Sequence, residues 1–447
     1  MVASTAALLA AAAIIIQVVS TNYTTDLTAP GGALWDFRDA GYFPVRAVLD
    51  GVVPYDVGSY FAEYPVAQEY PLLPPTYLLL HGPFQLLGLT AASIAVVILN
   101  LGAAVGLAWW CLKLSRYRYT IPAVLLVAAA ILISNGGRNV VYTGQATFLF
   151  VAGSYMAILA SRETQGAAGL FVALIKPGFG IPLVILLAAL GRYRRTVAGT
   201  IAAASVSAVM MVPFTIWAGG PSQLWQILTD NLAYSADSQW ISLATTTARV
   251  DVAAAIASLF DVVPSGAVEL LIAVAVLGST AIVLVARRSL LNRRRVPDAA
   301  VVLICTAMLT ATYHSFYDLP LLVLPTLLVA RRSFADRQAS QSTRWLLLGV
   351  LLAAQFNPFR VDTIQDGLSA YPRLVEILGP GVTGAAIFIA FLVALRLVWR
   401  LPNVNSIQKA SADAEGLEVG WHRSSRAENY TSGAWSHDSR LGERQER

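Results

Sequence analysis

Charged residues are scarce in this chain. Only 13% of its 447 residues are Asp, Glu, Lys or Arg, whereas soluble domains carry about 25%. Hydrophobic residues make up 56%, and the mean hydropathy is +0.62. These values exclude an ordinary soluble protein and indicate a protein that resides in the lipid bilayer. The apolar runs are continuous instead of alternating, which favours membrane helices over a transmembrane β-barrel.

Lysine and cysteine are also rare. The only lysines are Lys113, Lys176 and Lys409, so the net charge of +5 comes mostly from arginine. Arginine clusters between apolar runs are a topology signal, and no nucleic-acid partner is expected from them. Cys111 and Cys305 both lie inside apolar runs, which excludes a disulfide framework or a cysteine metal cluster. The arginine bias, with abundant Ala, Val and Leu, fits a GC-rich bacterial genome.

Several common catalytic and nucleotide-binding motifs are missing. The chain has no P-loop, no GxGxxG unit, no HExxH and no CxxC. A strict DxD is absent from the acidic stretch described below. We therefore expect no cofactor, and the sequence leaves a requirement for a divalent metal open.

Apolar runs of membrane-spanning length recur along most of the chain. The first of them is taken as a retained span and not as a signal peptide, because no basic segment precedes it. The pattern predicts an all-α, polytopic membrane protein over residues 1–400, with about 10–12 membrane segments including re-entrant or broken helices. The tail, residues 401–447, is polar and is expected to be a disordered cytoplasmic extension. Spans are expected at about 6–19, 91–112, 121–134, 146–160, 197–217, 266–285, 299–312, 319–330, 345–355 and 381–399.

Two apolar segments are interrupted near their centres. His81-Gly82-Pro83 breaks the segment 74–89, and Lys176-Pro177-Gly178 breaks the segment 166–190. We expect both to be re-entrant or broken, because Pro and Gly at membrane depth are tolerated where the backbone lines a cavity. The arginine-rich loops 113–118, 192–195, 287–295 and 331–344 then share the cytoplasmic side, and the segments 20–73, 135–145, 218–265 and 356–380 face outside. If both interrupted segments span instead, each of the segments 113–118 and 135–145 moves to the side opposite to the one given above.

The opening stretch, from Leu34 to Tyr77, overlaps the predicted outer loop 20–73 and is rich in acids and tyrosines. Asp36 and Asp39 follow the first span, next to Trp35, and their spacing places both carboxylates on one face of a helix. A carboxylate at the membrane–water boundary, surrounded by aromatic rings, is partly desolvated and can act as a general base. Acids are also ordinary in a loop outside a membrane, so the two residues are candidates as a pair.

Ionisable and polar residues in later segments supply the other candidates. Lys176 is an ammonium group inside an apolar segment, where it can meet a phosphate. His314 lies in the segment Thr312–Asp318 and can bond a sugar hydroxyl or phosphate, with Asp318 orienting it. Arg138 is a candidate phosphate clamp, although it also suits an ordinary loop. Further candidates for lining the same site are Gln145 and Tyr317, and the weaker pair is Arg360 and Asp362.

A series of short motifs follows a defined order over about residues 6–400. They are Asp36 in the first outer loop, Leu49-Asp50-Gly51, Val53-Pro54-Tyr55-Asp56, Tyr70-Pro71-Leu72 with Pro74-Pro75, Gly144-Gln145 with Thr147, Lys176-Pro177, and Tyr313-His314 with Tyr317-Asp318. This order resembles glycosyltransferase family 87, membrane enzymes of the GT-C fold that use polyprenyl-phosphate sugars. The family more often has adjacent Tyr-Pro-Pro where this chain has Tyr70-Pro71-Leu72-Leu73-Pro74-Pro75.

The resemblance implies a function and a set of roles. The family's catalytic aspartate lies soon after the first span, which carries onto Asp36, with Asp39 as the rival. Gln145, Lys176 and His314 would line the cavity. The implied partners are a polyprenyl-phosphate sugar donor, a glycolipid or glycan acceptor and the bilayer, and the implied reaction is inverting. Mannose is the first expectation for the sugar and arabinofuranose the second, with the site facing outward from a bacterial plasma membrane.

Two alternative functions compete with this one. A transporter or flippase of lipid-linked sugars would suit broken helices around Lys176, but the chain shows no internal repeat, and its acids gather in one early loop. An O-antigen ligase or polymerase would normally place its large outer loop late in the chain, and here it is early.

Overall fold

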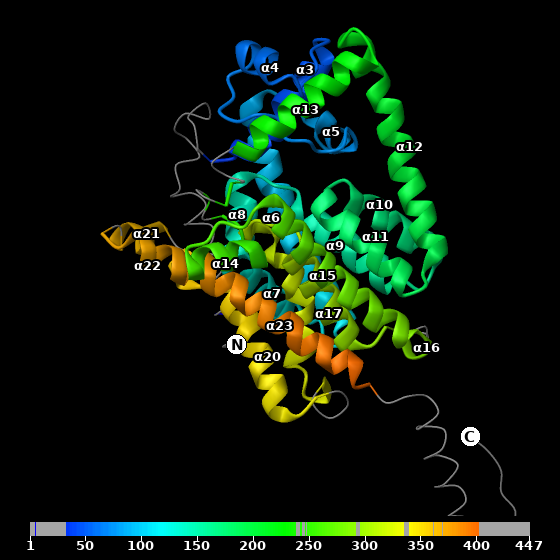
Figure 1. Cartoon of the computed structure of the whole chain (residues 1–447), viewed down its shortest axis with the longest axis vertical. Helices are drawn as coiled ribbons and strands as arrows, with labels where there is room; N and C mark the ends of the chain where they lie inside the picture. The colour runs from blue at the N-terminus through cyan, green and yellow to red at the C-terminus, as the bar shows by residue number, and fades with distance from the viewer. Residues whose placement is uncertain are drawn as a thin grey trace, which may run out of the picture. The chain divides into compact units, whose positions relative to one another are not determined.

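The computed structural model describes Thr5 and residues 33–237, 242–243, 246, 248–291, 296–334, 339–360, 362–368 and 370–401. The predicted first span, 6–19, and the predicted tail, apart from Leu401, lie outside the described residues. The residues described from 33 to 401 belong to one compact unit, drawn in Figure 1.

The prediction of an all-α membrane protein is confirmed. The described residues form helices and no β-strand, with a single isolated bridge between Arg249 and Ser315. Four of these helices are long and apolar enough to cross a membrane: α6 (Leu89–Leu114), α12 (Tyr193–Trp217), α15 (Gly266–Ala286) and the run Pro372–Trp399. The last run comprises α22 (Pro372–Glu376), η5 (Ile377–Gly381) and α23 (Val382–Trp399).

Bent and broken helices supply the remaining apolar segments. Helices α7 (Ile121–Ile133) and α8 (Asn135–Thr143) meet at an angle of 76° and together make up to a fifth span. The polar segment after Ser134 is thus a helix, which begins there because the Ser134 hydroxyl accepts a hydrogen bond from Gly137 N. The shorter apolar helices are α9 (Thr147–Leu159), α11 (Pro177–Ala189), α17 (Asp298–Ala311) and η3 (Phe316–Leu322) with α18 (Val323–Ala330).

Both interrupted segments are broken at the expected residues. The first forms α5 (Thr76–His81) and the 3-10 helix η2 (Gly82–Leu86). The second forms α10 (Glu163–Leu174) and α11, with Lys176 as the residue that precedes α11. Proline is well suited to the first turn of a helix, where its missing N–H has no partner to lose, so Pro177 starts a new helix instead of continuing α10.

All four segments predicted to face outside contain helices. The opening stretch folds into α2 (Trp35–Phe37), the π-helix η1 (Arg38–Tyr42), α3 (Phe43–Leu49) and α4 (Val57–Glu63). The 218–265 segment contains α13 (Pro221–Asp237) and α14 (Val252–Phe260). Helix α13 lies beside the opening stretch (Figure 1), where Asn231 Nδ2 donates to the carbonyls of Tyr55 and Tyr70, at 3.0 Å each. The other described elements are α16 (Arg288–Leu291), α20 (Gln341–Gln355), η4 (Pro358–Arg360) and α21 (Asp362–Gly367).

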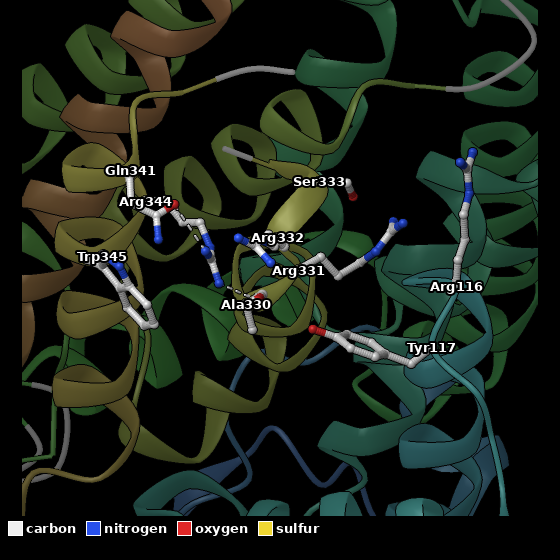
Figure 2. A pocket seen from close by; sticks show the side chains of 9 residues that line it. All are labelled: Arg116, Tyr117, Ala330, Arg331, Arg332, Ser333, Gln341, Arg344 and Trp345. Carbon is white, nitrogen blue, oxygen red and sulfur yellow. Dashed lines mark hydrogen bonds between the residues drawn. The ribbon is translucent and has the colours of Figure 1, made fainter. Parts of the chain in front are cut away.

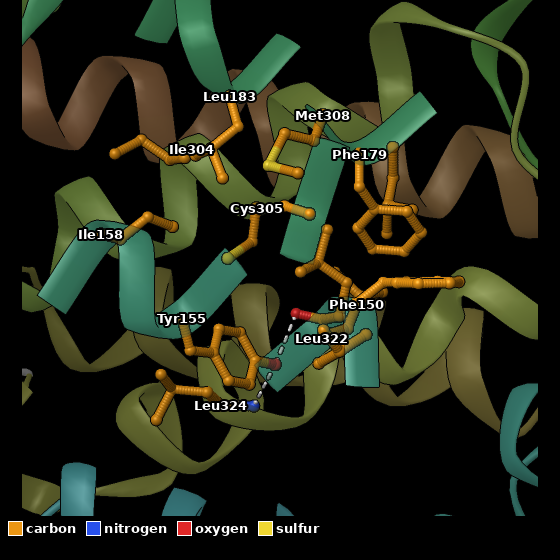
Figure 3. Close-up of a cluster of buried hydrophobic side chains, with 14 of the residues drawn as sticks. Phe150, Tyr155, Ile158, Phe179, Leu183, Ile304, Cys305, Met308, Leu322 and Leu324 are labelled. Carbon is orange, nitrogen blue, oxygen red and sulfur yellow. Dashed lines mark hydrogen bonds between the residues drawn. The ribbon is translucent and has the colours of Figure 1, made fainter. Parts of the chain in front are cut away.

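The core is organised around α17, in which every residue from Ala299 to Ala311 is buried. Side chains from α9 and α11 pack against it, as Figure 3 shows for Ile158, Leu183 and Ile304. Tyr155 joins this core to the segment carrying the predicted site residues: its hydroxyl donates to Leu321 O at 2.9 Å and accepts from Leu324 N at 3.2 Å. Because α17 is apolar on all its faces, it packs against other segments on every side, and this explains its central position.

Candidate active site

The opening stretch contacts the end of α8 at two positions. Leu34, with a φ of 61°, donates its N–H to Tyr142 O at 2.7 Å. Gly144 has a φ of 77°, and a Cβ atom there would lie 2.5 Å from the Cβ of Phe37. Only glycine permits both the left-handed backbone and this close approach. The contact places α2, and with it Asp36, beside the α8–α9 junction.

Asp36 is a buried carboxylate with one oxygen unpartnered. Its side chain is 7% exposed, and Oδ1 accepts a hydrogen bond from Gln68 Nε2 at 3.1 Å. Oδ2 is buried and has no hydrogen-bond partner. Burial raises the pKa of Asp36, while Gln68, Gln145, Thr143 and the charge of Lys176 oppose the rise. The carboxylate therefore holds its proton more tightly than a solvated aspartate, and one of its oxygens is not occupied by the protein.

Asp39 is also buried, but its oxygens are occupied. Arg38 forms an ion pair with it, and Oδ2 accepts from Arg38 Nη2 at 3.0 Å, from Ala67 N at 2.9 Å and from Gln68 N at 3.2 Å. Its backbone carbonyl accepts from the Tyr60 hydroxyl at 2.7 Å. Asp36 and Asp39 thus contact the same turn, as expected for one helical face. Asp39 holds that turn in place by accepting from two of its backbone N–H groups, whereas Asp36 accepts from the Gln68 side chain.

Lys176, His314 and Asp318 form a buried charged cluster. Lys176 Nζ lies 2.5 Å from Asp318 Oδ1, and His314 Nδ1 lies 2.8 Å from Asp318 Oδ2. His314 is fully buried, and its Nε2 has no hydrogen-bond partner. The Lys176 side chain is 13% exposed and is the member of the trio that reaches the surface. Asp318 therefore fixes the position of both the ammonium and the imidazole.

Aromatic rings surround the ammonium group. Lys176 Nζ lies 4.4 Å from the ring centroid of Tyr317 and 5.4 Å from that of Phe179, both within range of cation–π attraction. Phe179 also packs edge-on against His314, with ring centroids 5.2 Å apart. This arrangement requires the helix break at Lys176, because Phe179 belongs to the first turn of α11.

The segment that carries His314 is held by backbone hydrogen bonds to the chain around Arg249. Val250 N donates to His314 O, and Phe316 N donates to Ala248 O, at 2.9 Å each. Burial raises the pKa of the neighbouring Tyr313 to about 12; the hydrogen bond with Ser315 and the charge of Arg249 oppose the rise, and the carboxylates of Asp318 and Asp36 add to it.

The structure brings most of the predicted residues together. Gln145 and Lys176 act electrostatically on Asp36, and Asp36 acts on Tyr313, so these residues lie within electrostatic range of one another. Arg138 belongs to a different set of contacts: its Nη2 donates to Arg360 O at 3.3 Å, and Arg360 Nη2 donates to Arg249 O at 2.8 Å. The side chain of Asp362 lies outside the described residues.

Three contributors were not among the predicted residues. Gln68 contacts both aspartates, Thr143 lies near Asp36, and Phe179 packs on Lys176 and His314. Gln68 has no local sequence signal, because it lies in an irregular turn. Phe179 follows Lys176 closely enough for the helix break to point to it. Among the described residues, no group of three or more His, Cys, Asp or Glu is arranged to hold a metal ion.

A comparison with known protein families supports the family resemblance that the order of the motifs indicated. A family model described as Glycosyltransferase family 87 matches residues 72–325, which is more than half of the chain. The matched range includes Gln145, Lys176 and the segment with His314, whereas Asp36 and Gln68 precede it. No curated protein and no solved structure matches the chain.

Proposed function

Because this chain belongs to glycosyltransferase family 87, we propose that it transfers a sugar from a polyprenyl phosphate to an envelope glycolipid or glycan. The family match and the apolar helices establish a membrane glycosyltransferase. The finer proposal names mannose as the first choice of sugar and arabinofuranose as the second. It places the reaction on the outer face of a bacterial plasma membrane, where nucleotide sugars are absent and lipid-linked donors take their place.

The unpartnered oxygen of Asp36 carries the proposal. A general base works best when its pKa approaches the working pH, and burial raises the pKa of this carboxyl in that direction. In the proposed step, Asp36 Oδ2 takes the proton of the acceptor hydroxyl. The acceptor oxygen then bonds to the anomeric carbon from the face opposite the phosphate, and the bond from that carbon to the phosphate oxygen breaks. The polyprenyl phosphate leaves with the electron pair, and the anomeric configuration inverts.

Lys176 is suited to the leaving phosphate. An ammonium group has three N–H donors, and Asp318 accepts one of them in the described structure. The other donors can bond phosphate oxygens, and hydrogen bonds between charged groups are the stronger kind. Asp318 keeps the ammonium in place before the donor arrives, so little reorganisation accompanies charge development on the leaving group.

His314 is suited to a sugar hydroxyl. When its Nδ1–H donates to Asp318, the lone pair of Nε2 is left as an acceptor in a buried position. A buried acceptor without a partner costs free energy, and a hydroxyl of the bound sugar would remove that cost. Phe179 packs edge-on against the imidazole, and Tyr317 and Phe179 both lie against the neighbouring Lys176 ammonium.

Inside-out and right-side-out membrane vesicles containing the full chain test this function. They are supplied with radiolabelled polyprenyl-phosphate mannose, polyprenyl-phosphate arabinofuranose or a nucleotide sugar. The expected result is label attached to a lipid or glycan acceptor, from a polyprenyl-phosphate sugar only, and only when the outer face is accessible. Label that crosses the membrane still attached to its polyprenyl phosphate would support a flippase instead. Transfer from the nucleotide sugar alone would refute the proposed donor.

A further inference from the structure

Four arginines converge on an open pocket away from the candidate active site. The pocket has a volume of about 640 Å³ and is lined by Arg116, Tyr117, Ala330, Arg331, Arg332, Ser333, Gln341, Arg344 and Trp345. Figure 2 shows Arg116 and Tyr117 on one side, Arg344 and Trp345 on the other, and Arg331 and Arg332 between them. None of the described residues that line the pocket is acidic.

The pocket lies at the opposite end of one helical segment from the active-site cluster. The segment Phe316–Ala330 carries Asp318 near its start, and its last residue lines the pocket. A 3-10 helix followed by an α-helix of these lengths extends about 25 Å, close to the thickness of the hydrocarbon core. Both arginine-rich stretches that line the pocket, 113–118 and 331–344, belong to the side predicted to be cytoplasmic.

The arginines differ in what already binds them. Arg344 is part of the wall: its Nε donates to Val329 O at 3.0 Å and its Nη2 to Ala330 O at 2.7 Å. Arg331 lies 3.8 Å from Asp298 in a long ion pair whose two side chains are each 20% exposed. Arg116 and Arg332 are exposed, and no described carboxylate pairs with either. Among the described residues, Arg116 and Arg332 therefore present positive charge to the pocket without a paired carboxylate.

Arg116 occupies a backbone conformation that usually selects glycine. It follows the end of α6 with a φ of 60°, in the left-handed region. Side chains rarely adopt this conformation, and such outliers often accompany binding sites. The turn places its guanidinium on the rim of the pocket (Figure 2).

The surroundings match a membrane surface. Trp109, Tyr119 and Trp345 are 43%, 54% and 55% exposed, and aromatic residues of this kind gather at the level of lipid headgroups. Basic pockets between membrane helices on the cytoplasmic side suit phosphate-bearing headgroups, since guanidinium groups bond phosphate oxygens in pairs. We propose that this pocket binds the headgroup of an anionic phospholipid from the cytoplasmic leaflet. This proposal does not depend on the sugar donor or on the transfer reaction.

The test measures thermal unfolding of the full-length protein in detergent during a titration with a short-chain phosphatidylglycerol. Parallel titrations use the matching phosphatidylcholine and inorganic phosphate. A ligand that binds the folded state raises the unfolding temperature in a saturable way. We expect this rise with phosphatidylglycerol and not with the other two. A response to inorganic phosphate at the same concentration would identify a free-anion site and overturn the lipid proposal.

The variants compare two pairs of exposed arginines. The pocket variant combines Arg116→Gly, which suits the left-handed backbone, with Arg332→Gln. The control combines Arg194→Gln and Arg400→Gln, which removes the same charge from exposed positions outside the pocket. The pocket variant should weaken apparent phosphatidylglycerol affinity about 30-fold, since each arginine contributes about a fivefold factor, and the control should not. Equal affinities of wild type and pocket variant, or equal losses in both variants, would refute the pocket.

Discussion

The active-site cluster and the arginine pocket hold charge in opposite ways. In the cluster, Asp318 is buried and forms an ion pair with Lys176, whose side chain is 13% exposed, and Asp36 is buried as well. In the pocket, Arg116 and Arg332 are exposed and share one sign of charge. A buried charge that is paired is held in one position, which favours catalysis because little reorganisation accompanies the reaction. Exposed charge of one sign attracts an ion from outside, which suits binding. The following predictions, in order of expected size, test whether the two regions differ in this way.

The largest effect is expected from Asp36→Asn. Loss of the general base should lower sugar transfer by about 10²–10⁴-fold, measured with the labelled donor in vesicles. The variant should unfold at a higher temperature than wild type at neutral pH. Burial raises the folded-state pKa of Asp36, so stability is greatest when the group is protonated and is lost as the pH rises through that pKa. Glu63→Gln, in an exposed acid of the same stretch, is the control and should change neither quantity. Full transfer by Asp36→Asn would remove this residue from the mechanism.

A loss of stability is expected from Asp39→Asn. The change leaves the buried Arg38 without its anionic partner, and removing one member of a buried ion pair costs about 3–5 kcal/mol. The apparent unfolding temperature in detergent measures it. Reduced transfer should follow the reduced amount of folded protein. If Asp39→Asn is fully folded and inactive while Asp36→Asn is active, Asp39 is the base.

A smaller effect on transfer is expected from Lys176→Gln. The variant loses charged hydrogen bonds to the donor phosphate, each contributing about 1.5–3 kcal/mol, so transfer should fall about 10–100-fold. Lys113→Gln, which removes the exposed lysine on α6, is the matched control. Both are assayed by initial rates over a range of donor concentrations. Equal rates for the two variants would show that Lys176 does not bind the donor phosphate and only positions Asp318.

The pH dependence of transfer should follow Asp36. A base must be unprotonated, so kcat/KM should fall about tenfold per pH unit below its pKa. Since burial raises that pKa above the ordinary value of 3.8, the fall should begin at a higher pH than for a solvated aspartate. Asp36→Glu should retain an acidic limb with a shifted midpoint, and Asp36→Asn should lose it. An unchanged limb in Asp36→Asn would assign the titration to another group.

The smallest effect is expected from the arginine pocket. The combined Arg116→Gly and Arg332→Gln variant should transfer sugar in detergent within about twofold of wild type, because exposed charges are screened over the distance between the two regions. Initial rates at saturating donor check this. A loss comparable to that of Lys176→Gln would show that the two regions are coupled and do not work independently.

The membrane fold and the breaks at His81 and Lys176 were predictable from sequence, since apolar length and proline placement are local properties. The family was also predictable, from the order of short motifs. The family match over residues 72–325 confirms that prediction. The sequence also selected Asp36, Asp39, Lys176 and His314 as unusual in their surroundings, because ionisable groups near apolar segments are costly. Their roles as site residues stay predictions.

Only the tertiary structure decided how these groups differ. Asp36 and Asp39 have the same side chain and lie close together in the sequence, yet Asp39 Oδ2 accepts from Ala67 N and Gln68 N while Asp36 Oδ2 has no hydrogen-bond partner. The ion pair of Lys176 with Asp318 joins residues far apart in the chain. Local sequence determines which segments become helices, but burial and hydrogen-bond partners come from other segments. Those partners set the pKa of a carboxyl and determine which of its oxygens the protein leaves unoccupied.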